Sequence, residues 1–304
     1  MAPTIYLHIG IPKTGSGSLQ HFLKKNQQAL SKRGCLFPMT GRGRYDHHSQ
    51  FRFAATGLDY VFYYLFLRWK KYPDWYLRSP GLKQSRLSLL KEIEASGASS
   101  VVISSEWFSM GMFSGAIRRL SGLFEGFQTR PVMYIRRQDE AIQSFYAELI
   151  KNPFTRFSFD FNPGLMKFVP FFDYYREYQR WAEVFGHNNV IVRCYDQLLE
   201  RDINRDFLEL LRIEPEGLEL STARKNPHLN SAQIHALKRA NRQQLSESEY
   251  RNMLNEHESR QPSSGFDLLS ESQAASIRRH FADSNRRLAQ TAFAREWLFL
   301  DDFS

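Results

Sequence analysis

The sequence lacks several features that define other protein classes. Its 304 residues include two cysteines, Cys35 and Cys194, too few for a disulfide framework or a four-thiolate zinc site. The most apolar run, residues 60–67 (YVFYYLFL), is far shorter than the roughly 20 residues that span a bilayer. The first residues (MAPTIYLHIGIPKTG) lack a basic segment followed by an apolar one, so we expect no signal peptide. These absences predict a soluble protein of a reducing, cytoplasmic compartment.

The composition is that of a folded, basic protein. Hydrophobic residues make up 42% and charged residues 24% of the chain, which excludes a disordered or fibrous class. Lys and Arg number 41 against 32 Asp and Glu, a net charge of +9, so the partners should be anionic. An acidic membrane, an acidic glycan or a phosphorylated cofactor all fit this charge. The sequence has no RNA-binding signature and no concentrated basic tract, so we expect no nucleic acid.

Apolar strands alternate with helical patterns along the first two thirds of the chain. Thr4–Ile9 reads as a strand, and a helical pattern runs from Ser18 until Gly34 closes it. Further strands are predicted at 101–104, 132–135 and 190–192, and helices at 139–151 and 168–185. This alternation predicts an α/β fold, a P-loop-like parallel sheet flanked by helices on both faces. Ligands of such sheets bind at the C-terminal ends of the strands.

The pattern changes near residue 215, which divides the chain into a core (1–215) and a C-terminal part (216–304). Residues 219–230 are polar and loop-like, and the sequence from Ser231 onward is helical in character. One further strand is possible at Trp297–Leu300. We therefore expect a helical C-terminal extension that packs on the core.

A glycine-containing segment, Gly10–Ser18 (GIPKTGSGS), lies between the first strand and its helix. Backbone N–H groups at a helix N-terminus form an anion site when glycines permit close approach. The alternative is an ordinary tight turn with capping serines. A P-loop kinase would carry Lys-Ser or Lys-Thr where Ser16 and Gly17 stand, so its grip on ATP and Mg²⁺ is poorly supported.

The segment HIGIPKTGSGSLQ resembles the phosphosulfate loop of sulfotransferases that use 3′-phosphoadenosine 5′-phosphosulfate (PAPS). It is most similar to the bacterial and carbohydrate branches, whose loop reads P-K-T-G followed by three hydroxyl residues, so we expect a bacterial protein. Gly17 departs from that pattern. The resemblance implies a P-loop-like α/β core whose loop holds the 5′ end of PAPS through Lys13, Thr14, Gly15, Ser16, Gly17 and Ser18.

A second part of the family signature binds the 3′-phosphate. Arg136 follows the strand at 132–135, and Ser144 lies eight residues later in the next helix, as in the family. A guanidinium and a helix-borne hydroxyl suit a phosphate. Arg137 is an alternative phosphate ligand. The non-functional alternative is that the two arginines are simply solvated and that the position of the serine is incidental. The resemblance also implies a structural role for residues 190–199 and a nucleotide-covering loop in which Arg224 and Lys225 contact the 3′-phosphate.

The general base of a sulfuryl transfer should lie at the same edge of the sheet. Glu106 directly follows the strand at 101–104, and several carbohydrate branches use a glutamate there; the alternative is a helix-dipole charge. His47 and His48 are a second candidate, as the base or as residues that orient the acceptor; the alternative is a surface feature of a polar loop. His8 is predicted to be a core histidine. Lys13 would neutralise the leaving oxygen. No His, Cys and carboxylate cluster has metal-ligand spacing, so we expect no metal.

The acceptor is less sharply indicated. Aromatic residues cluster at 60–69, 72–76 and 168–178 among scattered cations. Core packing is their default role, but stacking on sugars or contact with a membrane surface also fits. The prediction is therefore sulfuryl transfer from PAPS to a carbohydrate or glycolipid hydroxyl or amine. A small alcohol or phenol acceptor, a P-loop kinase and a non-catalytic polyanion-binding module are the alternatives.

Overall fold

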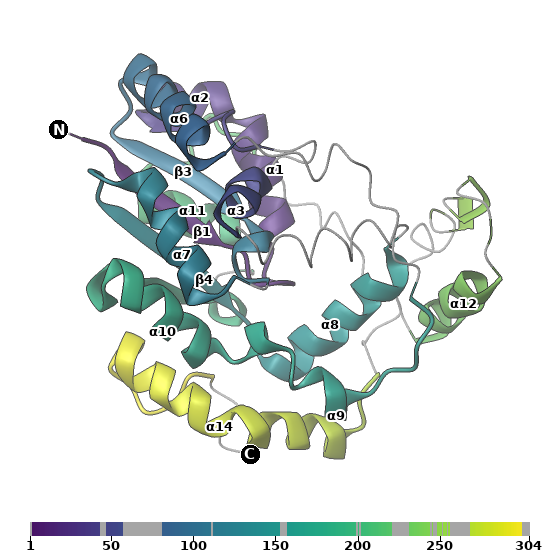
Figure 1. Cartoon of the computed structure of the whole chain (residues 1–304). Coiled ribbons are helices and arrows are strands. Elements are labelled where there is room, and N and C mark those ends of the chain that lie inside the picture. Colours follow the sequence, from purple (N-terminus) through teal and green to yellow (C-terminus); the bar gives the residue numbers. More distant parts are fainter. Residues whose placement is uncertain are drawn as a thin grey trace.

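The centre of the protein is a parallel β-sheet (Figure 1). We describe a computed structural model over residues 2–42, 47–56, 81–110, 112–152, 157–198, 200, 202–220, 231–243, 245, 248–250, 252, 253, 255 and 268–299. Within these residues the sheet has five strands in the order β2-β3-β1-β4-β5, all parallel. Their bounds are β1 Thr4–Ile9, β2 Cys35–Leu36, β3 Ser100–Ser105, β4 Thr129–Ile135 and β5 Ile191–Cys194. The predicted fold class is confirmed.

Helices cover both faces of the sheet because alternate strand residues point to opposite sides. On one face Ile5, Leu7 and Ile103 pack with α3 (Ser49–Thr56), α6 (Leu82–Ser96), α7 (Ser114–Ser121) and α10 (Tyr174–Phe185). On the other, Val102 and Val132 pack with α1 (Ser16–Lys25), α2 (Gln27–Lys32) and α11 (Ile203–Leu211). The loops at the strand ends are thereby held on a rigid support.

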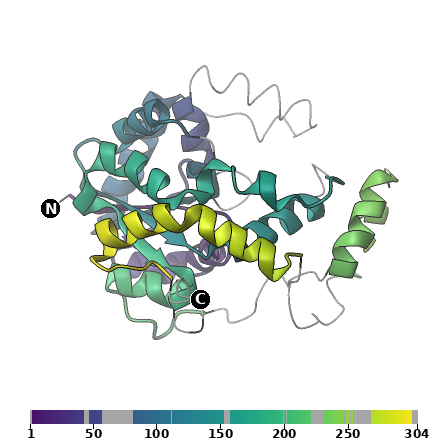
Figure 2. The same cartoon turned by 90° about the horizontal axis from the view of Figure 1, so that it is seen from below.

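A third apolar cluster joins the C-terminal helices to the helix that follows β4. It contains side chains of α8 (Gln138–Lys151), α9 (Pro163–Met166), α12 (Ser231–Arg242) and α14 (Glu271–Phe293). Figure 1 shows α8 beyond the C-terminal ends of the strands, and in Figure 2 α14 crosses the molecule along α10. None of the helices among the described residues is long and apolar enough to span a membrane.

Several element boundaries differ from the sequence prediction. The helix predicted from Ser18 to Gly34 is two helices, because the Asn26 side chain between them bonds the backbone at Phe22 and Glu219. The helix predicted from residue 168 begins at Tyr174, where Asp173 caps it by accepting from the Arg176 N–H at 3.2 Å. Strand β2 was missed, since two residues carry no periodicity.

The strand prediction at Trp297–Leu300 is wrong for residues 297–299, which are the described part of that segment. Leu298 and Phe299 are buried in the core cluster of α7 and α10, but they form no strand pairing. An apolar run of four residues marks burial and cannot by itself distinguish a strand from an irregular buried segment.

Two buried histidines hold the C-terminal end of β3 through one residue, Ser104. His8 Nδ1 lies 2.7 Å from Ser104 Oγ. His48 Nδ1 accepts from the Ser104 N–H at 3.1 Å, and His48 Nε2 donates to Pro38 O at 3.0 Å. Burial lowers the pKa of each histidine from 6.5 to about 3. Both rings are therefore neutral parts of the core, and His8 is the core histidine that was predicted.

Acid should destabilise the protein through these two histidines. Below pH 6.5 the unfolded chain binds protons that the folded protein excludes down to about pH 3, so stability falls with pH across that range. The loss is on the order of 1.4 kcal/mol per pH unit for each histidine. His48→Phe should therefore lower stability at pH 7.5 yet flatten the loss between pH 6.5 and 5 in urea unfolding. His235→Gln, an exposed control on α12, should keep the wild-type slope; equal slopes in wild type and His48→Phe would contradict this account.

Candidate active site

The loop between β1 and α1 lies beside the end of β3. The register pairs Ile9 with Ser105, and the Gly10 N–H donates to Ser105 O at 3.0 Å. Within the loop the buried Thr14 hydroxyl donates to Ile11 O at 2.7 Å. Lys13 has a φ of 70°, a left-handed conformation that costs a non-glycine residue on the order of 1 kcal/mol. The neighbouring strand ends and this internal bond therefore hold the loop in a strained, defined shape.

The N-terminus of α1 presents the features of an anion site. Gly15 (φ 85°) precedes the helix, no side chain caps it and its first turn has no acidic residue. The first N–H groups of a helix lack intrahelical acceptors and carry partial positive charge. The Ser16 hydroxyl is buried and makes no well-formed hydrogen bond within the described residues. These donors, with the Lys13 ammonium, fit the phosphosulfate group of PAPS.

Two glycines in this loop differ in what surrounds them. A Cβ on Gly15 would lie 3.1 Å from the Tyr195 ring and 3.2 Å from Ile203. A Cβ on Gly17 would have no atom within 4 Å. The side of α1 at Gly17 is therefore open.

Glu106 packs directly against the loop. It opens a 3-10 turn (Glu106–Phe108) after β3, and a Cβ on Gly10 would lie 2.9 Å from Glu106 Cα and Cγ. The Ser109 hydroxyl shares its one proton between Gly10 O at 2.8 Å and Glu106 O at 3.0 Å, which ties the two segments together. Only glycine at position 10 permits this approach.

The environment of Glu106 raises its pKa to about 7. Although part of the residue is accessible, desolvation of its carboxyl is the main cause, and the charge of Glu148 adds to it. The Lys13 ammonium and the Ser16 hydroxyl nearby lower the pKa. Glu106, the predicted base, is therefore close enough to the predicted Lys13 to feel its charge, and its carboxyl exchanges a proton near neutral pH.

The second motif lies at the end of β4. Arg136 is buried, and its guanidinium pairs with Glu140 and, at 3.5 Å from Nε, with Asp196 Oδ1. Arg137, the alternative, pairs with Asp139, which also binds Arg278 of α14. Ser144 is buried on α8, one turn beyond Glu140. The motif therefore has the predicted strand and helix positions, with Arg136 already held between carboxylates.

The other predicted residues are the histidine pair and the late basic loop. Both ring nitrogens of His48 bond to backbone groups, at Pro38 and at Ser104 in β3. His48 therefore stabilises the end of β3 and does not present a free base. His47 is half-buried beside it. Arg224 and Lys225 lie outside the described residues, as do the aromatic clusters at 60–69 and 72–76.

Three residues of the site were not predicted as functional. Glu148 Oε2 lies 3.5 Å from Lys13 Nζ, the Tyr195 ring packs on Gly15, and Asn204 donates to Ser18 Oγ at 3.4 Å. Glu148 follows Ser144 by four residues, and this spacing on a helix places it on the same face. That spacing was the available signal; the other two contacts depend on how β5 and α11 pack.

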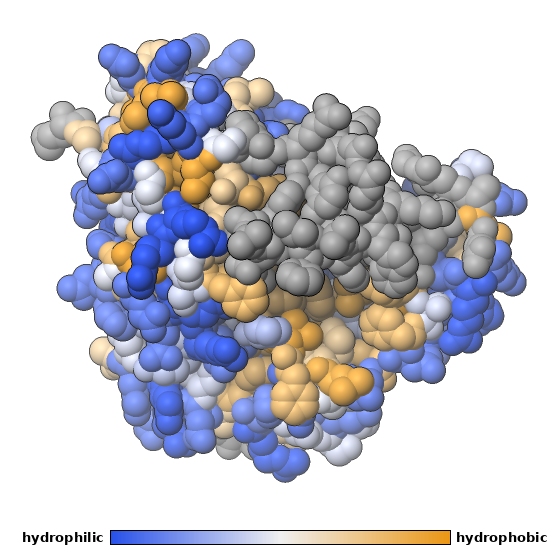
Figure 3. Space-filling view, in the orientation of Figure 1, coloured by the Kyte–Doolittle hydropathy of each residue, from blue (hydrophilic) through white to orange (hydrophobic). Residues whose placement is uncertain are grey.

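The predicted aromatic cluster at 168–178 divides between core and surface. Tyr174 and Tyr178 are buried in the core. Phe168 is 67% exposed and Leu165 69% exposed, and Figure 3 shows apolar residues gathered over α9. Core packing therefore accounts for the tyrosines of this cluster, while Phe168 and Leu165 remain available to a partner.

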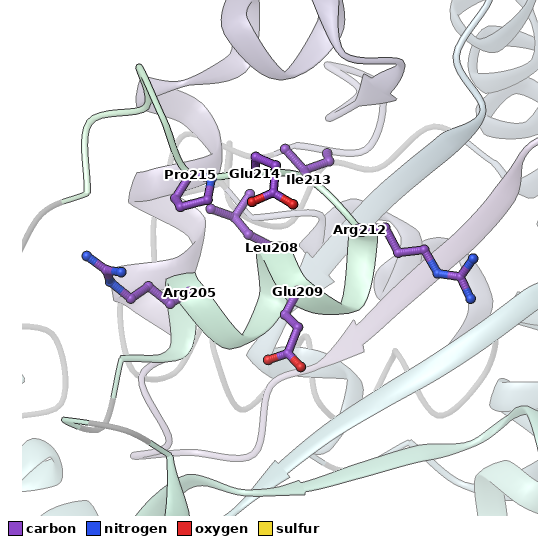
Figure 4. Close-up of a pocket in the computed structure, with 7 residues that line it drawn as sticks. All are labelled: Arg205, Leu208, Glu209, Arg212, Ile213, Glu214 and Pro215. Atoms are coloured by element: carbon purple, nitrogen blue, oxygen red, sulfur yellow. The ribbon is translucent and has the colours of Figure 1, made fainter.

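A separate pocket of about 340 Å³ lies at the C-terminal half of α11 (Figure 4). The N-terminal residues of α11, Ile203 and Asn204, contact the phosphate loop, so this pocket is at the other end of the helix. Arg205 and Arg212 extend to opposite sides of it in Figure 4, so they do not converge on one anion. Within the described residues, no group of His, Cys, Asp or Glu is arranged to hold a metal ion.

The two glycines provide a matched test of this loop. Gly15→Ala places a left-handed alanine against Tyr195 and Ile203 and should lower the free energy of unfolding by about 1–2 kcal/mol or more. Gly17→Ala fills open space in the first turn of a helix and should raise it by roughly 0.4–1 kcal/mol. Urea unfolding measures both. Equal effects of the two substitutions would contradict the loop geometry.

Comparison with known proteins supports the fold. No protein-family model matches the chain. An uncharacterized protein of Archaeoglobus fulgidus is 34% identical over 113 residues, which are 36% of this chain and only 30% of that protein's length. Among solved structures, a sulfotransferase from Alicyclobacillus acidocaldarius is similar, with a TM-score of 0.51 and 13% identity over 96% of each chain. At this identity the likeness shows the fold: the chain has the α/β architecture of that sulfotransferase.

Proposed function

We propose that the protein is a sulfotransferase that moves a sulfuryl group from PAPS to a hydroxyl or amine of an acceptor. The observation that carries the proposal is the packing of Glu106 against Gly10 of the loop, near the Lys13 charge and the uncapped N-terminus of α1. Desolvation there raises the pKa of Glu106 to about 7. The likeness in fold to a solved sulfotransferase supports the proposal. The lack of a lysine at position 16 disfavours a P-loop kinase.

In this proposal PAPS supplies the activated sulfuryl group. Its 5′ end is held by the backbone N–H groups of Thr14–Ser18, by the hydroxyls of Ser16 and Ser18 and by Lys13, and its 3′-phosphate by Arg136 and Ser144. Arg136 keeps five N–H donors in a fixed fork, and its pairing with Glu140 and Asp196 orients that fork at the end of β4. Arg224 and Lys225 stay proposed contacts on the strength of the sequence resemblance.

Glu106 is the proposed general base. A base works best when its pKa lies near the operating pH, and the enclosed carboxyl of Glu106 meets that condition. Its role is to take the proton of the acceptor hydroxyl or amine. The Lys13 ammonium opposes the negative charge that develops on the leaving oxygen, where a preorganised charge is most effective. His47 is the base to test next if Glu106 is dispensable.

The proposed acceptor is a carbohydrate or glycolipid. Exposed Phe168 and Leu165 over α9 are the described apolar groups that an acceptor with an apolar portion could contact. A small alcohol or phenol is the alternative. Turnover of PAPS against a panel of glycans, glycolipids and phenols distinguishes them, and peripheral contact with a membrane is tested by vesicle cosedimentation in the same series.

The donor assignment is tested by nucleotide binding. The product nucleotide, 3′-phosphoadenosine 5′-phosphate (PAP), should raise the melting temperature of the wild type, while adenosine 5′-phosphate, which lacks the 3′-phosphate, should raise it less. ATP with Mg²⁺ tests the kinase, and heparin at increasing salt tests the polyanion-binding module. If PAP has no effect on melting, the proposed function is wrong.

Turnover should depend on both groups at the loop. Lys13→Ala and Glu106→Gln should each reduce kcat at least a hundredfold, in line with the contributions of charge stabilisation and general-base catalysis. Lys32→Ala, which removes an exposed lysine of α2, is the matched control and should turn over normally. In the wild type, kcat/KM should fall below about pH 7 as Glu106 takes up a proton. Normal turnover by Glu106→Gln would move the base elsewhere.

Glu106 should also reduce stability at neutral pH. Its pKa of about 7 in the folded protein exceeds its ordinary value of 4.5, so the folded state binds the proton more tightly than the unfolded chain does. The free energy of unfolding therefore falls as the pH rises from 4.5 through 7. Glu106→Gln should therefore stabilise the protein at pH 8, by at most about 3 kcal/mol, and have little effect at pH 4.5. Urea unfolding at both pH values measures this, and a loss of stability at pH 8 would refute the desolvated state of the carboxyl.

A further inference from the structure

Glu148 is a second carboxylate at the phosphate loop, and the sequence resemblance assigns it no role. It lies in the last turns of α8, with its side chain 45% exposed, and its Oε2 is 3.5 Å from Lys13 Nζ. The Lys13 side chain is 23% exposed. The cation proposed to face the leaving oxygen is therefore paired with a carboxylate from another element.

The placement of Glu148 follows from the spacing on α8. Glu140, Ser144 and Glu148 are spaced four residues apart and lie on one face of the helix. From Glu140 to Glu148 this face extends about 12 Å along the helix axis, at 1.5 Å per residue. Glu140 contacts Arg136 at one end of this face and Glu148 contacts Lys13 at the other. One face of α8 thus supplies a carboxylate to each of the two cations that are proposed to hold the nucleotide.

The Lys13 ammonium has a carboxylate partner without an anionic ligand. Glu148 pairs with it at 3.5 Å, and Glu106 is close enough for the Lys13 charge to lower its pKa. A phosphate or phosphosulfate group that approaches Lys13 must compete with Glu148 for it. It must also approach the negative charge of Glu148, which opposes binding.

We propose that Glu148 is a positioning residue that holds Lys13 while no nucleotide is bound and yields it when the nucleotide binds. This rests on the proposed function, and it extends that function to the release of the product nucleotide. Because Glu148 competes for Lys13, it weakens the binding of PAP and so favours its dissociation after each turnover.

The effect of removing this carboxylate is opposite in direction to that of structural damage. Glu148→Gln and Glu148→Ala should each tighten PAP binding about three- to tenfold in isothermal titration calorimetry. They should also shift the acidic limb of kcat/KM to lower pH, because a negative charge beside Glu106 is lost. The matched control is Glu219→Gln, which breaks the Lys25–Glu219 pair, another exposed lysine–glutamate pair at 2.6 Å, and should leave both quantities unchanged.

A double-mutant cycle separates action through Lys13 from direct repulsion of the nucleotide. In a Lys13→Ala background, Glu148→Gln should change the PAP dissociation constant less than twofold. If its full effect persists there, Glu148 acts by direct repulsion and the positioning role is overturned. PAP binding that is unchanged or weaker in Glu148→Gln also overturns it, while the proposed function stands. If the wild type itself binds no PAP, the proposed function fails instead.

Discussion

The close approach of the Glu106 backbone and side chain to Gly10 is the contact on which the rest of the site depends. Parallel pairing places Ile9 opposite Ser105, so Gly10 and Glu106, which follow the two strands, lie directly beside each other. Glycine at position 10 leaves room for Glu106, and the two buried histidines at Ser104 fix the end of β3. The result is a carboxyl held away from water beside a loop that presents N–H groups and a lysine.

The site concentrates features that oppose stability. A desolvated carboxyl, a lysine in the left-handed region and a buried serine hydroxyl without a well-formed bond occur within one loop and the strand end beside it. Such strain persists where the surrounding structure over-determines it, and it clusters at functional sites. Here the support comes from both apolar layers, since α1 and α11 pack on one face of the sheet while α7 and α10 pack on the other.

Most of the fold was predictable from sequence, for identifiable reasons. Strands β1, β3 and β4 are largely buried on both faces and contain short apolar runs. The edge strand β5 is marked by the apolar residues 190–192, and the glycine and proline residues mark the loop after β1. Prediction failed where a tertiary contact or a capping side chain overrode a local pattern: Asn26 bonds to Glu219, Asp173 caps α10 at Tyr174, and the segment at Leu298 and Phe299 is buried but irregular. In each case the deciding partner is distant in sequence or is a single capping side chain.

The candidate site shows the same division. Sequence alone determined which residue types occupy the loop, the strand end at Glu106 and the Arg136–Ser144 spacing, because these follow from local order along the chain. Only the tertiary structure showed that the His48 ring is hydrogen-bonded to the backbone of Pro38 and Ser104. It alone also showed that Arg136 is paired with carboxylates and that Glu148 contacts Lys13. Burial and charge pairing arise from elements that meet across the sheet edge, and the pKa of Glu106 depends on them.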